Sequence, residues 1–252
     1  MEDEEVVWGR NAVLEALRGG RPVRRVVVAQ GTRTTGALAE VLAKSQAAGI
    51  AVQQVPREAL DRLCGTTRHQ GVAAVAAAYR YAALEEVLAG ARERGEDPLI
   101  LVLDSVQDPQ NFGSLMRTAE AVGAHGVIIP KHRAAGLTPA VAKASAGAIE
   151  HIKAVRVTNL ARALEDLKKQ GLWIVGIDMA GEQAYDEADL RLPVALVVGS
   201  EGRGLGRLVR EKCDFTVRIP MRGKVASLNA AVAGSLVLYE AWRQRERARR
   251  GR

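Results

Sequence analysis

The chain has 252 residues, of which 48% are hydrophobic and 26% charged, so it is too long for a small disulfide scaffold and can bury an ordinary core in one or two domains. It carries 28 arginines and 8 lysines against 29 acidic residues, which gives a formal net charge of +7. A basic, arginine-rich chain suggests a polyphosphate partner such as nucleic acid, although a coding bias towards arginine would produce the same composition.

The first eighty residues have the pattern of a small α/β unit. Their apolar runs predict strands, and their helical spacing, with Gly49 and Pro56 as boundary signals, predicts helices between them. The predicted strands are residues 23–29, 51–55 and 71–78, and the predicted helices are residues 37–48 and a segment that opens at Pro56.

Residues 81–97 are a polar, helix-prone connector, and the change in composition there predicts a domain boundary. From Pro98 onward, apolar strands alternate with helical patterns such as residues 160–170. The predicted strands are residues 99–103, 126–130, 152–157, 172–177, 194–198 and 215–219. This alternation predicts a parallel sheet covered on both faces, with its active site outside the carboxyl ends of the strands. The expected domains are residues 1–80 and 98–252, joined by the linker 81–97.

Three segments at predicted strand ends carry candidate chemistry. The first, residues 104–118, turns at Asp108 and enters a helix with Asn111 at the expected N-cap and Arg117 off the core side. Its expected buried stripe comprises Phe112, Leu115, Met116, Ala119 and Val122. A capped amphipathic helix with a solvated arginine is the plain alternative.

The second segment is a glycine-rich loop at residues 199–206, directly after a predicted strand. Its glycine spacing does not fit GxGxxG, and no GK[ST] follows, so neither a dinucleotide fingerprint nor a phosphate loop is indicated. Glycines allow a ligand to approach the backbone closely, but a simple turn would also explain them. Glu201, amid these glycines, is the unexplained residue.

The third segment, residues 219–229, brings Ser227 and Asn229 to the start of a long helix over residues 228–242. Ser227 taken alone is typical of an N-cap. The helix has so few polar residues that we expect it to be covered on two sides, with a second subunit as the natural cover. The tail after it holds six arginines and one glutamate, which is typical of a frayed, solvated end.

Several classes of site and protein are not supported. Cys64 and Cys213 stand alone, and the four histidines show no triad or ligand spacing, so no disulfide and no metal site is predicted. No apolar run approaches the roughly 20 residues of a membrane-spanning helix, so no membrane partner is expected. The acidic start of the chain is unlike a targeting segment, and we expect a cytoplasmic protein.

Taken together, NFGSLMR (111–117), VVGSEGRGL (197–205) and IPMRGKVASLNAAVA (219–233) resemble the three motifs of the TrmH/SpoU family of RNA ribose 2′-O-methyltransferases. The resemblance covers residues 98 to about 242. Residues 7–17 and 69–72 resemble the substrate-binding domain of the branch that methylates a guanosine in the peptidyl-transferase region of bacterial 23S rRNA. That domain in turn resembles small RNA-binding ribosomal proteins.

The resemblance implies a parallel α/β domain with a deep C-terminal trefoil knot, working as a homodimer. It places the cofactor, S-adenosylmethionine, at Gly199, Ile219 and Leu228. It assigns the activation of the ribose hydroxyl to Arg117, with Asn111, Glu201, Ser227 and Asn229 completing the catalytic site. Because arginine gives up its proton only with great difficulty, we interpret Arg117 as a phosphate clamp and oxyanion stabiliser instead of a base, and Glu201 as orienting Arg117 or Asn229.

The expected function is therefore 2′-O-methylation of a guanosine ribose in 23S rRNA. Two alternatives stay open: the same chemistry on a tRNA guanosine or another rRNA site, and a non-catalytic RNA-binding or ribosome-assembly factor. The expected RNA contacts are arginines sharing one helical face (Arg203, Arg207 and Arg210), with Arg10, Arg68 and His69 as weaker candidates.

Overall fold

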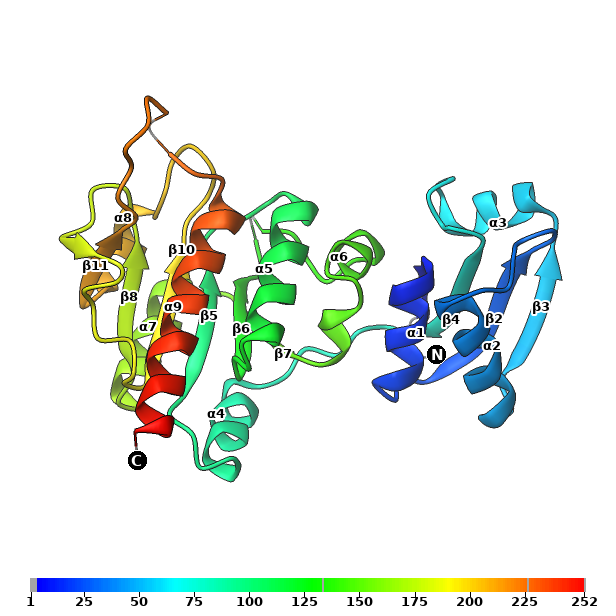
Figure 1. Cartoon of the computed structure of the whole chain (residues 1–252), viewed down its shortest axis with the longest axis horizontal. Helices are drawn as coiled ribbons and strands as arrows, with labels where there is room; N and C mark the ends of the chain where they lie inside the picture. Colours follow the sequence, from blue (N-terminus) through cyan, green and yellow to red (C-terminus); the bar gives the residue numbers. More distant parts are fainter. Residues whose placement is uncertain (1–3, 133, 226, 252) are drawn as a thin grey trace. The chain divides into compact units, whose positions relative to one another are not determined.

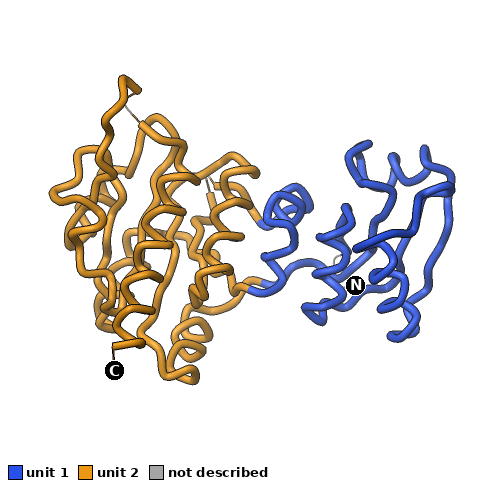
Figure 2. Tube along the Cα trace, in the orientation of Figure 1, with its two compact units in different colours: residues 1–80, 137–151 blue, residues 81–136, 152–252 orange. Residues whose placement is uncertain are grey.

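The computed structural model describes residues 4–132, 134–225 and 227–251. Its contacts divide the chain into two compact units (Figure 2): the residues up to 80 with 137–151 form unit 1, and residues 81–136 with those from 152 onward form unit 2. This division differs from the expected domains in two places. Segment 137–151 joins unit 1 although it follows from the second half of the sequence, and residues 81–97 join unit 2.

Unit 1 is a four-stranded sheet in the order β1-β4-β2-β3, in which β2 and β3 are parallel and the other pairs antiparallel. Strand β2 alternates: Val26 and Val28 belong to one core cluster, and Val27 and Ala29 to another on the opposite face. The elements of unit 1 are β1 (Glu4–Trp8), α1 (Arg10–Arg18), β2 (Val23–Ala29), α2 (Ala37–Ala47), β3 (Ala51–Val55), α3 (Arg57–Cys64), β4 (Val72–Ala77), α6 (Pro139–Ala144) and the 3-10 turn η1 (Ala148–Glu150).

Unit 2 is a seven-stranded sheet in the order β7-β6-β5-β10-β8-β11-β9 (Figure 1). Every strand pair in it is parallel, which confirms the predicted parallel sheet. Its elements are α4 (Leu84–Glu93), β5 (Leu99–Leu103), α5 (Pro109–Ala121), β6 (Gly126–Pro130), β7 (Lys153–Val157), α7 (Leu160–Lys169), β8 (Trp173–Ile177), β9 (Gln183–Ala184), β10 (Val194–Val198), α8 (Arg207–Lys212), β11 (Phe215–Arg218) and α9 (Ala230–Arg250).

The strand order of unit 2 creates a switch point between β5 and β10. From β5 the chain moves outward to β6 and β7, and it then returns to build β8 and β10 on the other side. Loops leaving two neighbouring strands in opposite directions open a crevice at their carboxyl ends, which is where parallel sheets bind ligands. The trefoil knot expected in the C-terminal stretch stays a prediction.

Helices α5 and α9 lie side by side on one face of this sheet (Figure 1). A Cβ atom on Gly234 of α9 would come within 2.5 Å of Leu115 on α5 and 2.9 Å of Val198 on β10. Glycine there lets α9 pack closely against both elements. The predicted stripe of α5 is buried as expected, with Phe112, Leu115, Met116 and Ala119 at 0% exposure and Val122 at 7%.

The start of α5 corrects one prediction. The N-cap is Asp108, whose side chain accepts a 3.0 Å hydrogen bond from the backbone N–H of Asn111, so Asn111 lies inside the first turn. Pro109 at the first helical position suits this start because its fixed φ is already helical. At α9 the cap is Asn229 and not Ser227: its Oδ1 accepts from the N–H groups of Ala231 and Val232.

The basic tail is not frayed, which is a second correction. Helix α9 continues to Arg250, and the guanidinium of Arg245 is anchored among backbone carbonyls. Its nitrogens donate to the carbonyl oxygens of Asp97, Pro98, Leu190 and Leu192 at 2.6–3.2 Å. A side chain that donates to four carbonyls ties the tail to the amino ends of β5 and β10, and composition alone does not reveal such a contact.

The excluded classes of site can be checked across residues 4–132, 134–225 and 227–251. Within these ranges no cluster of His, Cys, Asp and Glu has the arrangement of a metal site, and no helix is long and apolar enough to cross a membrane. Both cysteines are free, and burial raises the pKa of the Cys64 and Cys213 thiols to about 11. A raised pKa keeps a thiol in its neutral form, which is the less nucleophilic one.

Candidate active site

A cavity of about 690 Å³ opens at the carboxyl ends of β8, β10 and β11 and at the start of α9. We call it the first cavity. Its wall combines apolar side chains with backbone of the glycine loop, and Gly199, Ile219 and Leu228, the three predicted cofactor residues, all line it. An apolar wall with backbone groups suits an adenosyl ligand. Apolar side chains can contact the faces of the adenine ring, and backbone groups can form hydrogen bonds with its edge.

The glycine loop after β10 forms one side of this cavity and doubles back on itself. Ser200 and Gly204 exchange two backbone hydrogen bonds of 3.0 Å. A Cβ atom on Gly199 would lie 2.2 Å from the carbonyl carbon of Gly204 and 2.5 Å from the nitrogen of Leu205. Glycine at 199 is therefore required by the closeness of the returning backbone, and the loop is at once a tight turn and a ligand wall.

A second cavity, of about 620 Å³, lies at the switch point between β5 and β10. The loop after β5 and the loop after β10 both line it. Asp104, only 7% exposed, joins the two loops, because its Oδ2 accepts a 2.7 Å hydrogen bond from the backbone N–H of Gly206. Asp104 is not among the site residues predicted from the sequence. The available signal was an acidic residue directly after an apolar strand.

Three predicted catalytic residues meet between the two cavities. The side-chain amide of Asn111 donates to Oε1 of Glu201, and that of Asn229 donates to the same oxygen at 3.2 Å. Asn229 also donates to Oδ1 of Asn111 at 2.9 Å. We call this triangle the amide–carboxylate cluster. Asn111 lines the second cavity and Glu201 lines both, so the cluster stands at their common wall.

The other two predicted catalytic residues lie outside this triangle. Ser227 is exposed and lines the first cavity. Arg117 is exposed on α5, lines neither cavity, and forms no hydrogen bond or ion pair with any described residue. Of the two partners considered for Glu201, the structure brings it to Asn229 and leaves Arg117 apart.

The arginines expected to share a helical face are divided between a loop and a helix. Helix α8 begins at Arg207, so Arg203 stands in the glycine loop, where it lines both cavities. Arg210 pairs with Asp178 at 3.1 Å on the rim of the first cavity, and Arg207 pairs with Glu211. The shared face predicted for all three is therefore wrong, because Gly206 delays the start of the helix.

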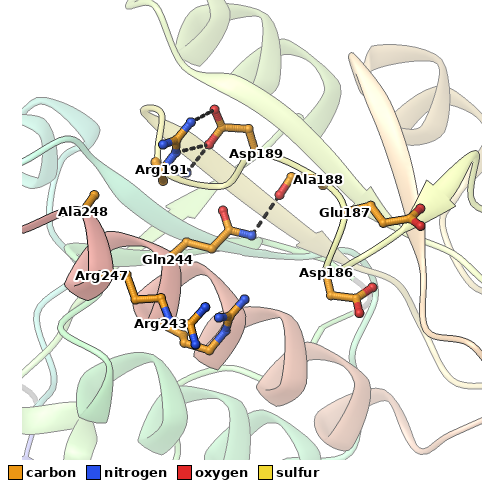
Figure 3. A pocket seen from close by; sticks show the side chains of 9 residues that line it. All are labelled: Asp186, Glu187, Ala188, Asp189, Arg191, Arg243, Gln244, Arg247 and Ala248. Carbon is orange, nitrogen blue, oxygen red and sulfur yellow. Dashed lines mark hydrogen bonds and ion pairs between the residues drawn. The ribbon is translucent and has the colours of Figure 1, made fainter. Parts of the chain in front are cut away.

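An open hollow of about 510 Å³ lies beside α9 (Figure 3), and none of the predicted site residues lines it. Two pairs of its lining residues contact each other: Arg191 pairs with Asp189 at 2.9 Å, and Gln244 donates to the carbonyl oxygen of Ala188 at 2.9 Å. The hydrogen bond from Arg191 lowers the pKa of Asp189 to about 2. Paired charges in an open hollow give no reason to assign it a ligand.

Two family models match the chain. The model of the SpoU rRNA methylase family matches residues 98–239, and the model described as RNA 2′-O ribose methyltransferase substrate binding matches residues 6–82. The first covers the two cavities and the cluster, and the second covers the sheet of unit 1.

Relatives and solved structures match over nearly the whole length. A TrmH family tRNA/rRNA methyltransferase of Bacillus subtilis, YacO, is 50% identical over 244 residues, covering 97% of each chain. The SpoU methyltransferase AviRb of Streptomyces viridochromogenes, solved with AdoMet, matches with a TM-score of 0.80 and 29% identity over 97% of this chain and 91% of that one. An AdoMet-bound rRNA methyltransferase of Sinorhizobium meliloti matches with a TM-score of 0.76 and 27% identity, covering 95% of this chain and 87% of that one.

Proposed function

This chain belongs to the TrmH/SpoU family of S-adenosylmethionine-dependent RNA 2′-O-methyltransferases, and we propose that its substrate is a guanosine ribose in the peptidyl-transferase region of 23S rRNA, methylated in the cytoplasm. The observation that supports the chemistry of this proposal is the amide–carboxylate cluster at the common wall of the two cavities. The full-length match to an enzyme named as an rRNA methyltransferase, unit 1 included, supports rRNA as the substrate.

We assign the first cavity to the cofactor. Gly199, Ile219 and Leu228 hold S-adenosylmethionine there, through backbone groups of the glycine loop and apolar contacts with the two side chains. When bound, the cofactor supplies a methyl group already activated on a positively charged sulfur. The protein therefore needs mainly to align the acceptor and to help its hydroxyl lose a proton.

We assign the second cavity to the target nucleotide. Asn111 and Asn229 both donate to Oε1 of Glu201, which fixes this carboxylate at the wall between the cavities. Its other oxygen, Oε2, has no hydrogen bond within the described ranges and is available to accept one from a ribose hydroxyl. A fixed acceptor at that place orients the 2′-oxygen toward the first cavity, and alignment of this kind supplies much of a rate enhancement.

Arg117 acts in this proposal on the RNA backbone. It stands on an exposed surface of α5 and forms no hydrogen bond or ion pair with any described residue. A bidentate contact with a phosphate next to the target nucleotide would hold the ribose in place. Since Arg117 lines neither cavity of its own chain, this role requires RNA or a second chain to cover that surface.

The exposed face of α9 supports a homodimer. Four apolar side chains of α9 recur along its outer face and are exposed: Val232 at 48%, Leu236 at 39%, Tyr239 at 49% and Trp242 at 40%. A stripe of this size on a long helix is typical of an interface, because isolated soluble domains seldom leave one in water. Sedimentation equilibrium of wild-type protein and Leu236→Asp tests this pairing, with a monomeric wild type as the contrary result.

The substrate is tested by methylation with labelled donor. Transcripts of 23S rRNA and of tRNA are offered separately, and the modified nucleotide is mapped. We expect label in one guanosine of the peptidyl-transferase region, at its ribose 2′-oxygen. Label confined to tRNA, or to another rRNA site, would show that the chemistry is right and the substrate wrong.

A non-catalytic RNA-binding or assembly factor is the alternative of a different class. A protein that only binds RNA has no use for a glycine loop, an apolar cavity and an amide–carboxylate cluster at one strand edge. Calorimetric titration with S-adenosylmethionine separates the two. RNA binding without cofactor binding would favour the assembly factor.

A further inference from the structure

Unit 1 brings four basic residues together around the N-terminal end of α1: the side chains of Arg10 and Lys143 lie there, and Arg33 and Arg68 join them through the backbone carbonyls that these side chains contact. Arg10 begins that helix, and its guanidinium donates to the carbonyl oxygens of Gln70 at 3.3 Å and of Arg33 at 3.4 Å. Lys143, from α6, donates through Nζ to the carbonyl oxygen of Arg68. We call Arg10, Arg33, Arg68 and Lys143 the cation cluster.

Segment 137–151 is what completes this cluster. It follows β6 and α5 in the chain, but α6 packs against β1 and α1 of unit 1. There the Nζ of Lys143 stands 4.4 Å from the ring centroid of Trp8, a cation–π contact that fixes its position. The cluster is thus assembled from four separate stretches of sequence, and no sequence motif announces it.

The positive charges of the cluster are not paired with carboxylates, unlike those of three other arginines of the same unit. At the far end of α1, Arg18 pairs with Glu15 and Glu40. Arg21 pairs with Glu5 and Glu150, and Arg24 pairs with Glu4; these are structural ion pairs. The polar contacts of Arg10 and Lys143, by contrast, are made to carbonyl oxygens, and no carboxylate of the described residues pairs with a member of the cluster.

This arrangement is unfavourable for the protein alone. The N-terminal end of a helix carries partial positive charge, so basic side chains there are repelled by it and by one another. Burial, followed by the nearby charge of Arg68, lowers the pKa of Lys143, which is the expected result of such crowding. A site that concentrates unneutralised positive charge is matched to an anionic ligand.

The loop that presents the cluster is held rigid beforehand. His69 is fully buried, its Nδ1 accepts from the N–H of Gly71 at 3.0 Å, and its Nε2 lies 2.7 Å from Oδ1 of Asp61. The side chain of Gln70 accepts from the backbone N–H of Arg10 at 3.1 Å. His69 is therefore a structural residue that shapes the loop and not an RNA contact, whereas Arg68 beside it is exposed.

We propose that the cation cluster of Arg10, Arg33, Arg68 and Lys143 is a binding site for RNA phosphates on unit 1. The inference rests on the proposed function, because it takes the anion to be the backbone of the RNA substrate. Phosphate contacts position an RNA without reading its sequence, so the cluster sets affinity and register and leaves the choice of nucleotide to unit 2.

A matched pair of double variants tests the proposal in the full-length protein. Arg33→Gln/Arg68→Gln removes two exposed charges from the cluster, and Arg18→Gln/Arg24→Gln removes two ion-paired charges from the same unit, so the net charge changes equally. The probe is a transcript of the peptidyl-transferase region of 23S rRNA, and its Kd is measured over a range of salt concentrations. Each lost phosphate contact lowers the slope of log K against log salt by about 0.7–0.9.

We expect the cluster variant to lose affinity and roughly 1.4–1.8 of that slope, at about 0.7–0.9 for each of two contacts, and the control variant to stay near wild type. Lys143→Gln should weaken binding further and Lys143→Arg should preserve it, with thermal unfolding showing that both are folded. Equal slopes for the two double variants would overturn the cluster, while cofactor binding and methyl transfer by the wild type would leave the proposed function standing. A wild type that neither binds nor methylates RNA would remove the proposed function itself.

Discussion

Asn229 donates a 2.9 Å hydrogen bond to Asn111, although the two residues lie 118 positions apart in the sequence. One stands in the first turn of α5 and the other caps α9. The bond therefore joins the starts of the two helices that cover one face of the sheet, at the point where both cavities meet. Glu201 completes the contact by accepting from both amides.

The first prediction separates the two functions of Asn229. Serine keeps an oxygen for the N-cap of α9 but cannot donate to Asn111 and Glu201 together. Hydrogen bonds to a charged group contribute about 1.5–3 kcal/mol, so Asn229→Ser should lower the single-turnover rate of methyl transfer roughly tenfold to hundredfold with little loss of stability. Asn229→Ala should lose both the rate and about 1 kcal/mol of stability. A serine variant with the wild-type rate would contradict the orienting role of Asn229.

Arg117 is predicted to matter for turnover and not for folding. Its side chain is exposed and forms no hydrogen bond with described residues, so Arg117→Ala should change the free energy of unfolding by no more than about 0.5 kcal/mol. Arg117→Lys keeps the charge but loses the bidentate fork, and we expect a clearly reduced single-turnover rate. A lysine variant close to the wild-type rate would show that charge alone suffices and would exclude the clamp.

Gly199 is predicted to be intolerant of any side chain. Its Cβ would lie 2.2 Å from backbone atoms of Gly204, a distance that only movement of the glycine loop can relieve. Gly199→Ala should therefore abolish cofactor binding in calorimetry. Gly223→Ala, where a Cβ would meet nothing within 4 Å, is the matched control and should bind normally. Normal binding by Gly199→Ala would show that the loop does not shape the cavity.

Arg245 is predicted to be a stability residue. Its removal would take a donor from four carbonyl oxygens at the amino ends of β5 and β10, of which that of Pro98 keeps a hydrogen bond from the N–H of Val194. Water can replace the donor at the exposed carbonyls of Asp97 and Leu192, so the cost arises mainly at the buried Leu190. Stranding such a polar group costs about 1–3 kcal/mol, and we expect a loss of about 1–3 kcal/mol for Arg245→Ala in denaturant unfolding. Arg247→Ala, on the exposed side of the same helix, should be near neutral. Equal effects of the two would contradict the anchoring of the tail.

Glu240 is predicted to contribute to the acid sensitivity of the fold. Hydrogen bonds from Arg243, and then from Gln244, hold the pKa of this carboxyl below its ordinary value, and its side chain is 8% exposed. A depressed pKa in the folded state gives stability that is present above the ordinary pKa of about 4.3 and is lost as the pH falls through the folded value. The stability difference between wild type and Glu240→Gln should therefore be largest above about pH 5 and shrink below it. A difference independent of pH would show that the charge of Glu240 contributes nothing.

Much of the fold was determined by local sequence. The apolar runs of β5, β6 and β10 and the periodicity of α5 predict their elements, because a buried strand or an amphipathic helix needs only its own residues to announce itself. Strand β1 and helix α1 were not predicted as elements: β1 starts with two glutamates, and its pairing with β4 is a contact between distant segments.

The sequence determined which residues form the candidate site, and the tertiary structure determined how they are arranged. The motifs supplied Asn111, Glu201 and Asn229, but only the strand order, with β10 beside β5, brings the loops that carry them to one edge. The tertiary structure also leaves Arg117 apart from them. The distance of a helical residue from a site depends on the direction in which its helix presents it, and not on its neighbours in a motif. The cation cluster is the clearest case, since Lys143 reaches Trp8 only because segment 137–151 folds onto unit 1. Composition revealed that the chain is basic, and packing decided which of those charges are neutralised by carboxylates and which are left for a ligand.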